Sequence, residues 1–391
     1  MSIITLHWVY VGIKLLVICA ALDLSKPYGS TPALWQLFKA MYELGHELII
    51  IPYHGHDIPS LWWRSYPNPN YYKGLILEKF LKIVKHSHGK KNTPFIPTFA
   101  RILARPNIEK LVNRILLNEN DVEAILMINV PLNQLKGFAT HIRRNHANFP
   151  IILYDIDVPT SLPSYGGFTF NHYIGADLSE YDSFIIPSEG SVHELMELGA
   201  KDVHVVHFGV DPEVYTPIPV KQDFDVLFFG NGSRDRENNI RMMITEPSKV
   251  LKYKFVISGR YLDTDVGNAS ITTPFSFTEW RKHCSGSKIN LNVVRETHAK
   301  VYGTSTSRPF ELASMKCCTV SAPYLGLENW FVVGKEILIA NSSKECIELY
   351  QTLINDDDLR IKIGEAARAR VMKEHTSRHR AEQIIDIARK Y

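Results

Sequence analysis

The apolar residues of this chain gather in short runs that are separated by polar and helix-forming stretches. Between the first two runs, residues 31–44 place Leu34, Leu37 and Met41 on one face of a helix, and Gly45 marks its end. Continuous apolar strands that alternate with amphipathic helices are typical of a parallel sheet covered on both faces. The runs of strand length in the first half are 14–20, 47–52, 124–129, 150–154, 184–187 and 203–207.

The same alternation restarts after a stretch that contains Pro212, Pro217 and Pro219. We therefore expect two Rossmann-like, doubly wound α/β domains, residues 1–215 and 216–391, which face each other across a cleft. The last helix is expected to pack back toward the first domain. Strands are predicted at 225–230, 254–259, 288–293, 318–322 and 336–340, and helices at 191–198, 278–284, 307–315, 343–354, 358–374 and 377–389.

Length and composition agree with this division. A chain of 391 residues exceeds the size at which one core usually keeps growing, and 45% hydrophobic with 22% charged residues is ordinary for a folded protein. The apolar stretch at 8–22 is only about 15 residues long and contains Lys14, which favours a buried strand over a membrane anchor. Five cysteines without a C-x-x-C pattern indicate reduced core residues in a cytoplasmic protein.

Two loops that follow predicted strands contain residues suited to anions, because ligands of open α/β sheets bind at the carboxyl ends of strands. In the first, Gly230 and Gly232 let the backbone approach a ligand, and Arg234 and Arg236 match phosphate oxygens. The alternative is an ordinary glycine turn with solvated arginines, because the third glycine of a dinucleotide site is missing.

The second loop leads into a helix whose first turn contains Pro309. The free N–H groups and the dipole of a helix start bind anions, Arg308 adds charge, and Glu311 is placed to accept hydrogen bonds from a ribose. Alternatively, Ser307 is only the N-cap and Glu311 only a favourable charge near a helix start. The hydroxyl-bearing residues of this loop are Thr304, Ser305, Thr306 and Ser307.

The C-terminal motifs resemble a known family. Residues 302–385 are similar to the C-terminal domain of CgeB-like glycosyltransferases, within the wider family 1/family 4 group of GT-B enzymes. The similarity follows the order of four motifs, namely SRPFELA at 307–313, GKE at 334–336, NDD at 355–357 and HT at 375–376. It is fainter over 225–293. The resemblance implies the GT-B fold and a hexosyl- or pentosyltransferase that uses a nucleoside-diphosphate sugar.

By this resemblance, Glu311 binds the donor ribose and Asn292 lies near the nucleotide. The 304–308 loop lies against the pyrophosphate, and the 230–236 loop faces the phosphates. GT-B enzymes resemble one another in using basic side chains and a helix end in place of a metal, so no metal or cofactor is expected, and Arg234, Arg236 and Arg308 are the candidate cations. Many retaining relatives have a second glutamate where this chain has Gly303, eight residues before Glu311, so retention and inversion both stay open.

The expected reaction transfers a sugar, from a UDP-sugar by family habit, to an acceptor hydroxyl. If it inverts, a base from the N-terminal domain must reach that hydroxyl, and Asp155 and Asp157 follow a strand there. Strand-end carboxylates also cap loops, and His54, His56 and His172 are lesser candidates. Asp155-x-Asp157 also matches the metal-binding pair of single-domain GT-A transferases, as does 263–265, but a second Rossmann-like domain favours GT-B.

The segment 58–120 is a basic and aromatic insertion, with 11 Lys and Arg residues against three acidic ones. Three interpretations compete: an acceptor site for a polyanion such as hydroxymethylated DNA, a patch on anionic lipid, and a solvated helical face with aromatics in the core. A glycan acceptor is a further possibility. The candidate acceptor residues are His54, Trp62, Trp63, Arg64, Lys90 and Lys91, with Tyr66, Tyr71 and Tyr72 nearby.

Two other functions fit the same residues. A GT-B chain can bind a sugar nucleotide without transferring the sugar, or can epimerise it without an acceptor. Arg308 and Glu311 favour donor binding in each case, so only turnover distinguishes these functions from transfer.

Overall fold

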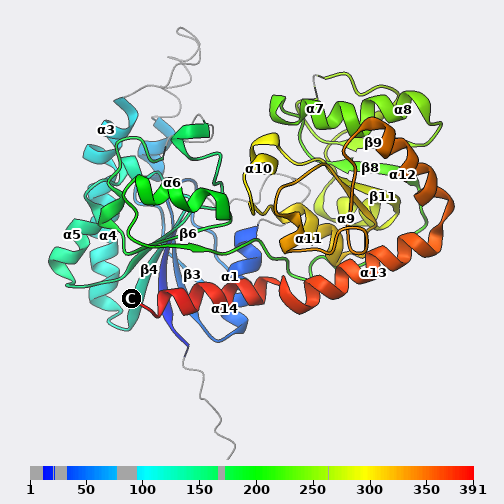
Figure 1. Ribbon diagram of the computed structural model, residues 1–391. Coiled ribbons are helices and arrows are strands. Elements are labelled where there is room, and N and C mark those ends of the chain that lie inside the picture. The colour runs from blue at the N-terminus through cyan, green and yellow to red at the C-terminus, as the bar shows by residue number, and fades with distance from the viewer. Residues whose placement is uncertain (1–11, 21, 23–32, 77–94, 166–171, 263) are drawn as a thin grey trace, which may run out of the picture.

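The computed structural model describes residues 12–20, 22, 33–76, 95–165, 172–262 and 264–391 (Figure 1). Within these residues the chain forms a seven-stranded sheet in the order β3-β2-β1-β4-β5-β6-β7 and a six-stranded sheet in the order β10-β9-β8-β11-β12-β13. Neighbouring strands in both sheets run parallel. The expected α/β architecture of two Rossmann-like domains is confirmed.

In the N-terminal sheet, strand β1 shows why the strands are continuously apolar. Leu16 and Ile18 belong to one core, and Leu15 and Val17 belong to the core on the opposite face. The strands are β1 Lys14–Cys19, β2 Glu47–Pro52, β3 Arg64–Ser65, β4 Val122–Ile128, β5 Ile151–Tyr154, β6 Ser183–Ile186 and β7 Val203–Val205. The helices are α1 Ala33–Glu43, α3 Phe95–Leu103, α4 Arg105–Asn118, α5 Phe138–Asn145 and α6 Val192–Glu197.

The C-terminal sheet packs on a separate core that includes Trp280 and Phe310. Its strands are β8 Phe224–Phe229, β9 Phe255–Ser258, β10 Ser270–Thr272, β11 Ser287–Asn292, β12 Thr319–Ser321 and β13 Leu338–Ile339. Its helices are α7 Glu237–Ile240, α8 Glu246–Val250, α9 Phe277–Ser285, α10 Glu296–Lys300, α11 Ser307–Ser314, α12 Ser343–Asn355 and α13 Asp357–Glu374, with a π-helical turn at Arg241–Thr245. Short 3-10 turns occur at Leu132–Gln134, Pro163–Tyr165, Leu178–Glu180, Glu189–Ser191, Arg234–Arg236 and Leu327–Asn329.

The last helix, α14 Ser377–Ala388, crosses from the C-terminal domain to the N-terminal one, where it lies beside α1 (Figure 1). Ala381, Ile384 and Ile385 are buried in the same core as β1. The crossing is fixed by backbone bonds, because Val210 N donates to His375 O (3.1 Å) and Ser377 N donates to Val210 O (2.8 Å). No helix in the described part of the chain is both long enough and apolar enough to cross a bilayer.

Candidate active site between the domains

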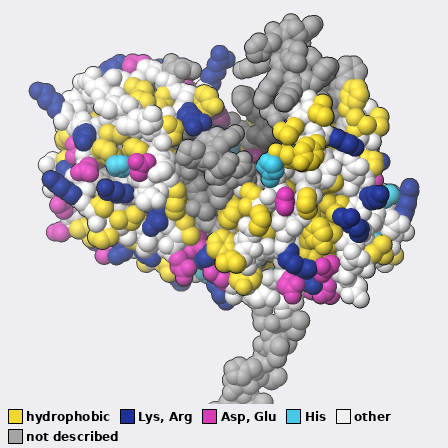
Figure 2. Space-filling view, turned by 180° about the vertical axis from the view of Figure 1, so that it is seen from behind, with side chains coloured by type: hydrophobic (Ala, Val, Ile, Leu, Met, Phe, Trp, Pro, Cys, Tyr) yellow, Lys and Arg dark blue, Asp and Glu magenta, His cyan; other side chains and the backbone are white. Residues whose placement is uncertain are grey.

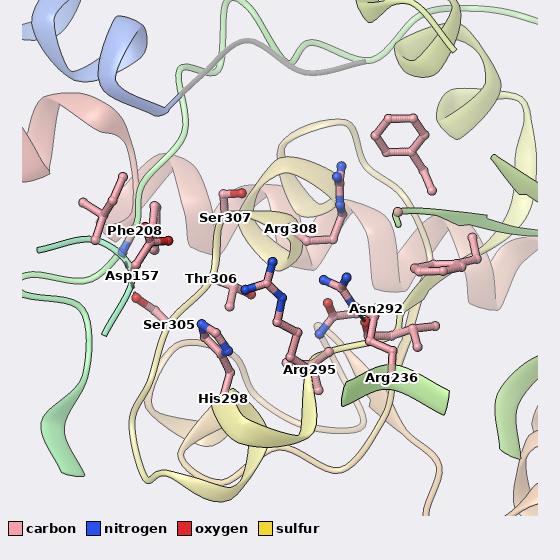
Figure 3. A pocket seen from close by; sticks show the side chains of 16 residues that line it. Asp157, Phe208, Arg236, Asn292, Arg295, His298, Ser305, Thr306, Ser307 and Arg308 are labelled. Atoms are coloured by element: carbon pink, nitrogen blue, oxygen red, sulfur yellow. Dashed lines mark hydrogen bonds between the residues drawn. The ribbon is translucent and has the colours of Figure 1, made fainter. Parts of the chain in front are cut away.

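A pocket of about 250 Å³ lies between the two domains at the carboxyl ends of the strands. Phe229 and Asn292, which end β8 and β11, line it together with the start of α11. From the N-terminal domain it receives Asp157 and Phe208, which follow β5 and β7 (Figure 3). The two sheets therefore bring residues that are far apart in the sequence to one cleft.

Arg236 is the most firmly held cation of this pocket. Its Nε donates to Val293 O (2.9 Å) and its Nη1 donates to Asn231 O (2.8 Å). Burial, together with the nearby charges of Arg295 and Arg308, lowers the pKa of Arg236 to about 10. Because this value is still above neutral pH, Arg236 stays charged, and the pocket is electropositive.

Arg308 is fixed by aromatic rings and by a carboxylate. Its guanidinium lies over Phe229 (4.9 Å to the centroid) and over Trp280 (4.5 Å). Its Nη1 lies 2.9 Å from Glu311 Oε2, although the angle does not make a hydrogen bond. Glu311 is only 3% exposed and does not line the pocket. In this structure Glu311 therefore neutralises and orients Arg308, and its contact with a donor ribose stays a prediction.

The start of α11 completes the cationic wall. Thr306 is the N-cap residue, without a side-chain capping bond, and Ser307 is the first helical residue. The alternative in which Ser307 is the N-cap was therefore wrong by one position. Thr306, Ser307 and Arg308 line the pocket, and the first N–H groups of a helix have no intrahelical partner. This end of α11 is suited to binding an anion.

The glycine loop after β8 does not have the expected arrangement. Gly230 lines the pocket, but Gly230 N donates to Ser258 O (3.0 Å) and Gly232 N donates to Arg260 O (2.7 Å). A Cβ atom at Gly232 would lie 2.2 Å from Tyr261 O, so this glycine permits close packing of two loops. Arg234 is exposed and is not among the residues that line the pocket. Of this loop, Arg236 and Gly230 reach the site.

The hydroxyl-rich loop before α11 also joins the domains. Ser305 lines the pocket and its Oγ accepts from Phe208 N (2.9 Å), whereas Thr304 is buried and its Oγ1 lies 2.7 Å from Ser188 Oγ. Backbone bonds from Gly190 N to Tyr302 O (2.9 Å) and from Ser305 N to Pro187 O (2.8 Å) extend this contact. We call the contact between 187–190 and 302–305 the interdomain seam. Asn292, which also lines the pocket, donates through Nδ2 to Ser321 Oγ (2.9 Å).

Gly303 lies in this seam with a positive φ of 60°. A Cβ atom at this position would lie 2.7 Å from Glu189 Cδ of the N-terminal domain. The Glu189 carboxylate is held there, since its Oε1 accepts from Asn329 Nδ2 (3.0 Å) and lies 3.4 Å from His207 Nε2. The opposite domain thus fills the space that a side chain at position 303 would need.

The two aspartates after β5 have different environments. Asp155 is buried, and its carboxylate accepts from Ser161 Oγ (2.6 Å), Tyr173 OH (2.7 Å) and Asp157 N (2.9 Å). Asp155 does not line the pocket. Its oxygens are already bonded within the loop, as expected for a structural cap, so the structure does not support a catalytic role for Asp155.

Asp157 does line the pocket, and its carboxylate accepts one hydrogen bond from within the described chain, from Asn129 Nδ2 (3.0 Å). Burial and the charge of Asp155 raise the pKa of Asp157 to about 6, against the opposing effect of Arg295. A carboxylate that titrates near neutral pH is suited to taking a proton from a hydroxyl group. Asp157 is therefore the better candidate base.

Arg295 and His298 line the same pocket and were not predicted. Figure 3 shows them between Asp157 on one side and Arg236 on the other. Burial and the two neighbouring arginines lower the pKa of His298 to about 3, so its imidazole is neutral. Both residues follow the carboxyl end of β11, and that position is the signal by which they could have been found in the sequence.

None of the candidate acceptor residues in the described chain lines the pocket. Trp63 is buried, its ring centroid lies 4.7 Å from that of Trp35, and its Nε1 donates to Ile58 O (2.9 Å). Trp62 also packs on Trp35 (6.2 Å). These two tryptophans pack against α1 as part of the core, and they do not form an acceptor site.

Arg64 is exposed and binds Glu119 through two bonds (2.6 and 3.0 Å). Lys14, at the start of β1, pairs with the same glutamate (3.4 Å), so Arg64 lies at the end of the sheet opposite to the pocket. Lys90 and Lys91 lie outside the described residues. On the face shown in Figure 2, basic and acidic side chains are intermixed across both domains.

The remaining aromatic and histidine candidates also lie away from the pocket lining. Tyr66 is partly buried against the core of its domain, and Tyr71 hydrogen-bonds His56. His54 and Tyr72 are exposed. His172 is buried, which lowers the pKa of its imidazole to about 4.

Among the described residues, no group of three or more His, Cys, Asp and Glu side chains is arranged to hold a metal ion. Asp265 pairs with Lys249 (2.6 Å), and Asp263 lies outside the described part of the chain.

Solved structures share this fold over almost the whole chain, among them the following three. Sucrose-phosphate synthase from Thermosynechococcus elongatus is 11% identical with a TM-score of 0.64, over 97% of this chain and 98% of that one. HepE from Anabaena in complex with UDP-glucose is 13% identical with a TM-score of 0.61, over 97% and 100%. The E. coli trehalose-6-phosphate structure bound with UDP-2-fluoro glucose is 12% identical with a TM-score of 0.61, over 97% and 99%.

No curated protein matches the chain in sequence. Residues 236–386 match the family model described as glycosyl transferase-like. This matched segment contains Arg236, Arg295 and Arg308, which form the cationic side of the pocket, and the neutral His298. The C-terminal half is thus glycosyl transferase-like in sequence, and the chain as a whole has the GT-B glycosyltransferase fold.

Proposed function

We propose that this protein transfers a sugar from a nucleoside-diphosphate sugar to an acceptor hydroxyl. The observation that carries the proposal is the pocket itself, in which three guanidinium groups and a helix start from one domain face a carboxylate from the other. The family match over 236–386 supports it. The neighbours bound to UDP-glucose and UDP-2-fluoro glucose favour a UDP-sugar as the donor.

In the proposed reaction the diphosphate lies along Arg236, Arg308 and the start of α11. These groups stabilise the leaving diphosphate, so a metal ion is not required. The acceptor hydroxyl attacks the anomeric carbon while Asp157 takes its proton. The order of motifs from 307 to 376 favours the CgeB-like branch within the GT-B group.

The test is a thermal-shift and hydrolysis screen against nucleoside-diphosphate sugars, with arms that contain EDTA or Mn²⁺. We expect one donor to raise the melting temperature in EDTA, and Arg308→Ala to reduce that shift. Stabilisation only with Mn²⁺ would contradict the metal-free reaction. Stabilisation by no donor would contradict the function itself.

The donor found in this way is then incubated with hydroxymethylated DNA, glycan and lipid acceptors, and NMR of the product gives its anomeric configuration. Donor binding without turnover would identify a sugar-nucleotide-binding protein, and an epimerised donor without acceptor would identify an epimerase.

A further inference from the structure

The segment after β11 carries a pocket cation, Arg295, whose side chain is not hydrogen-bonded or ion-paired to any residue that the structure describes. Arg236 is bonded to two carbonyl oxygens and Arg308 is paired with Glu311. The guanidinium of Arg295, by contrast, makes no hydrogen bond or ion pair within the described part of the chain, although Arg295 lines the pocket. A partly buried guanidinium with five unused donors is suited to an anionic ligand.

The backbone that carries Arg295 is held on both sides by side chains of the 235–239 segment, so the position of Arg295 is fixed before any ligand arrives. Arg295 is the N-cap residue of α10 and His298 lies within that helix, and both line the pocket. Three contacts hold the backbone: Arg236 Nε to Val293 O (2.9 Å), Asn239 Nδ2 to Val294 O (3.0 Å) and Thr297 N to Asp235 Oδ1 (3.1 Å). A fourth joins two side chains, Asn238 Nδ2 to Glu296 Oε1 (2.7 Å).

His298 is the second unsatisfied group on this side. It is 7% exposed, and its buried Nδ1 has no hydrogen-bond partner in the described chain. Buried polar atoms are nearly always paired in folded proteins, and His298 lines the pocket, so its unpaired ring nitrogen points to a ligand there. The charge of Arg295 and the polar ring of His298 together suit phosphate oxygens.

We propose that Arg295 and His298 bind the diphosphate oxygens on which negative charge develops as the sugar leaves. This inference rests on the proposed function. The bond between the anomeric carbon and the diphosphate oxygen breaks, and its electron pair stays on that oxygen. The acceptor oxygen forms the new bond, and its proton goes to Asp157. The freed terminal phosphate gains close to one negative charge near neutral pH, because its last pKa is about 6.

The three arginines then differ in what they recognise. Arg236 and Arg308 are already positioned by the protein, and they bind the diphosphate before and after sugar transfer. Arg295 acts on the carboxylate of Asp157 without forming an ion pair with it. Its guanidinium donors therefore stay open, and its interaction strengthens as the ligand becomes more negative. An interaction that is stronger in the transition state than in the ground state raises kcat.

The experiment compares two ligands on the full-length protein: the sugar nucleotide found in the donor screen, and its free nucleoside diphosphate. Calorimetry of Arg295→Ala should show at least tenfold more loss of affinity for the free diphosphate than for the sugar nucleotide, and His298→Gln should show a smaller loss in the same direction. Arg308→Ala should weaken both ligands alike. In turnover assays Arg295→Ala should lower kcat by about 100-fold with little change in KM.

Lys300→Ala is the matched control. Lys300 ends α10, the helix that begins directly after Arg295; it is exposed and pairs with Glu296 (2.7 Å). It removes the same charge without touching the pocket, and both affinities should stay at the wild-type level. Arg295→Lys keeps the charge but not the planar guanidinium, so it should give an intermediate loss of affinity for the free diphosphate. A graded loss of this kind would not result from a folding defect in the alanine variant.

Equal loss of both ligands in Arg295→Ala, or no loss of either, would overturn the assignment of Arg295 and His298 while the proposed function stands. A wild-type protein that binds neither ligand would overturn the proposed function, and this assignment with it.

Discussion

The two sides of the cleft use different chemistry. The C-terminal side contributes Arg236, Arg295 and Arg308 together with the start of α11, and most of these groups are held in place by bonds within their own domain. The N-terminal side contributes Asp157, a carboxylate whose pKa is raised to about 6. One side thus recognises an anion by fixed charges, whereas the other provides a group that exchanges a proton. Substitution of Asp157 should therefore leave donor affinity unchanged, whereas substitution of Arg308 should weaken it.

Asp157→Asn should have the largest effect. The substitution keeps the size of the side chain but removes the group that accepts the proton, so we expect kcat to fall by about 10²- to 10⁴-fold. The donor affinity measured by calorimetry should stay close to that of the wild type, because the anion contacts lie on the other side. Unchanged turnover, or an equal loss of donor affinity, would show that this division between the two sides is wrong.

The pH profile of the wild type should show the same group. Asp157 must be deprotonated to act as a base, and its pKa is about 6, so kcat/KM should be level above that value and fall about tenfold per pH unit below it. The measurement is initial rates from pH 4.5 to 8.5. A profile that stays flat down to pH 5, or that still breaks near 6 in Asp157→Asn, would contradict the assignment.

Arg308→Ala should have the next largest effect, on the C-terminal side. A hydrogen bond to a charged group contributes about 1.5–3 kcal/mol, so the donor affinity should fall about ten- to a hundredfold. Arg234→Ala is the matched control, because Arg234 is exposed and lies outside the pocket lining. If both variants lost affinity equally, long-range charge would explain donor binding better than these contacts.

The contrast between Arg234 and Arg236 also shows where sequence reasoning stopped. Both follow the same strand, and the motif placed both at the phosphates. The contact that turns Arg236 into the pocket is with Val293, 57 residues along the chain, and no local pattern contains it. In the same way, the ring of Trp280 beneath Arg308 comes from α9. Side-chain directions in the site depend on such long-range contacts.

Strands were easier to predict than loops for a physical reason. Strands buried on both faces are continuously apolar, so β1, β2, β4 and β8 were visible in the sequence. The two-residue strand β3 and the three-residue strand β10 lie at sheet edges and are too short for a period to appear. Asp155 and Asp157 could be told apart only once the structure showed that Ser161 and Tyr173 donate hydrogen bonds to the Asp155 carboxylate.

Gly303→Ala tests the seam that holds the two sides together, with a smaller expected effect. A side chain at a φ of 60° is strained, and its Cβ would meet Glu189 Cδ at 2.7 Å. We expect the free energy of unfolding to fall by about 1–3 kcal/mol, as measured by denaturant titration. Adding Glu189→Ala should restore the part that is due to the contact and leave the part that is due to φ. Full stability in the single variant would show that the domains separate easily in solution.

Arg64→Ala should have the smallest effect, and it sharpens the comparison by testing a basic residue that belongs to neither side of the cleft. Arg64 is half exposed and pairs with Glu119 at 2.6 Å. Exposed ion pairs contribute about 0–1 kcal/mol, so unfolding by denaturant should change by no more than this. Turnover and the KM for the acceptor should equal those of the wild type, because Arg64 lies at the end of the sheet where β1 begins. A raised acceptor KM would mean that the acceptor extends around the domain, and that the basic segment takes part in binding after all.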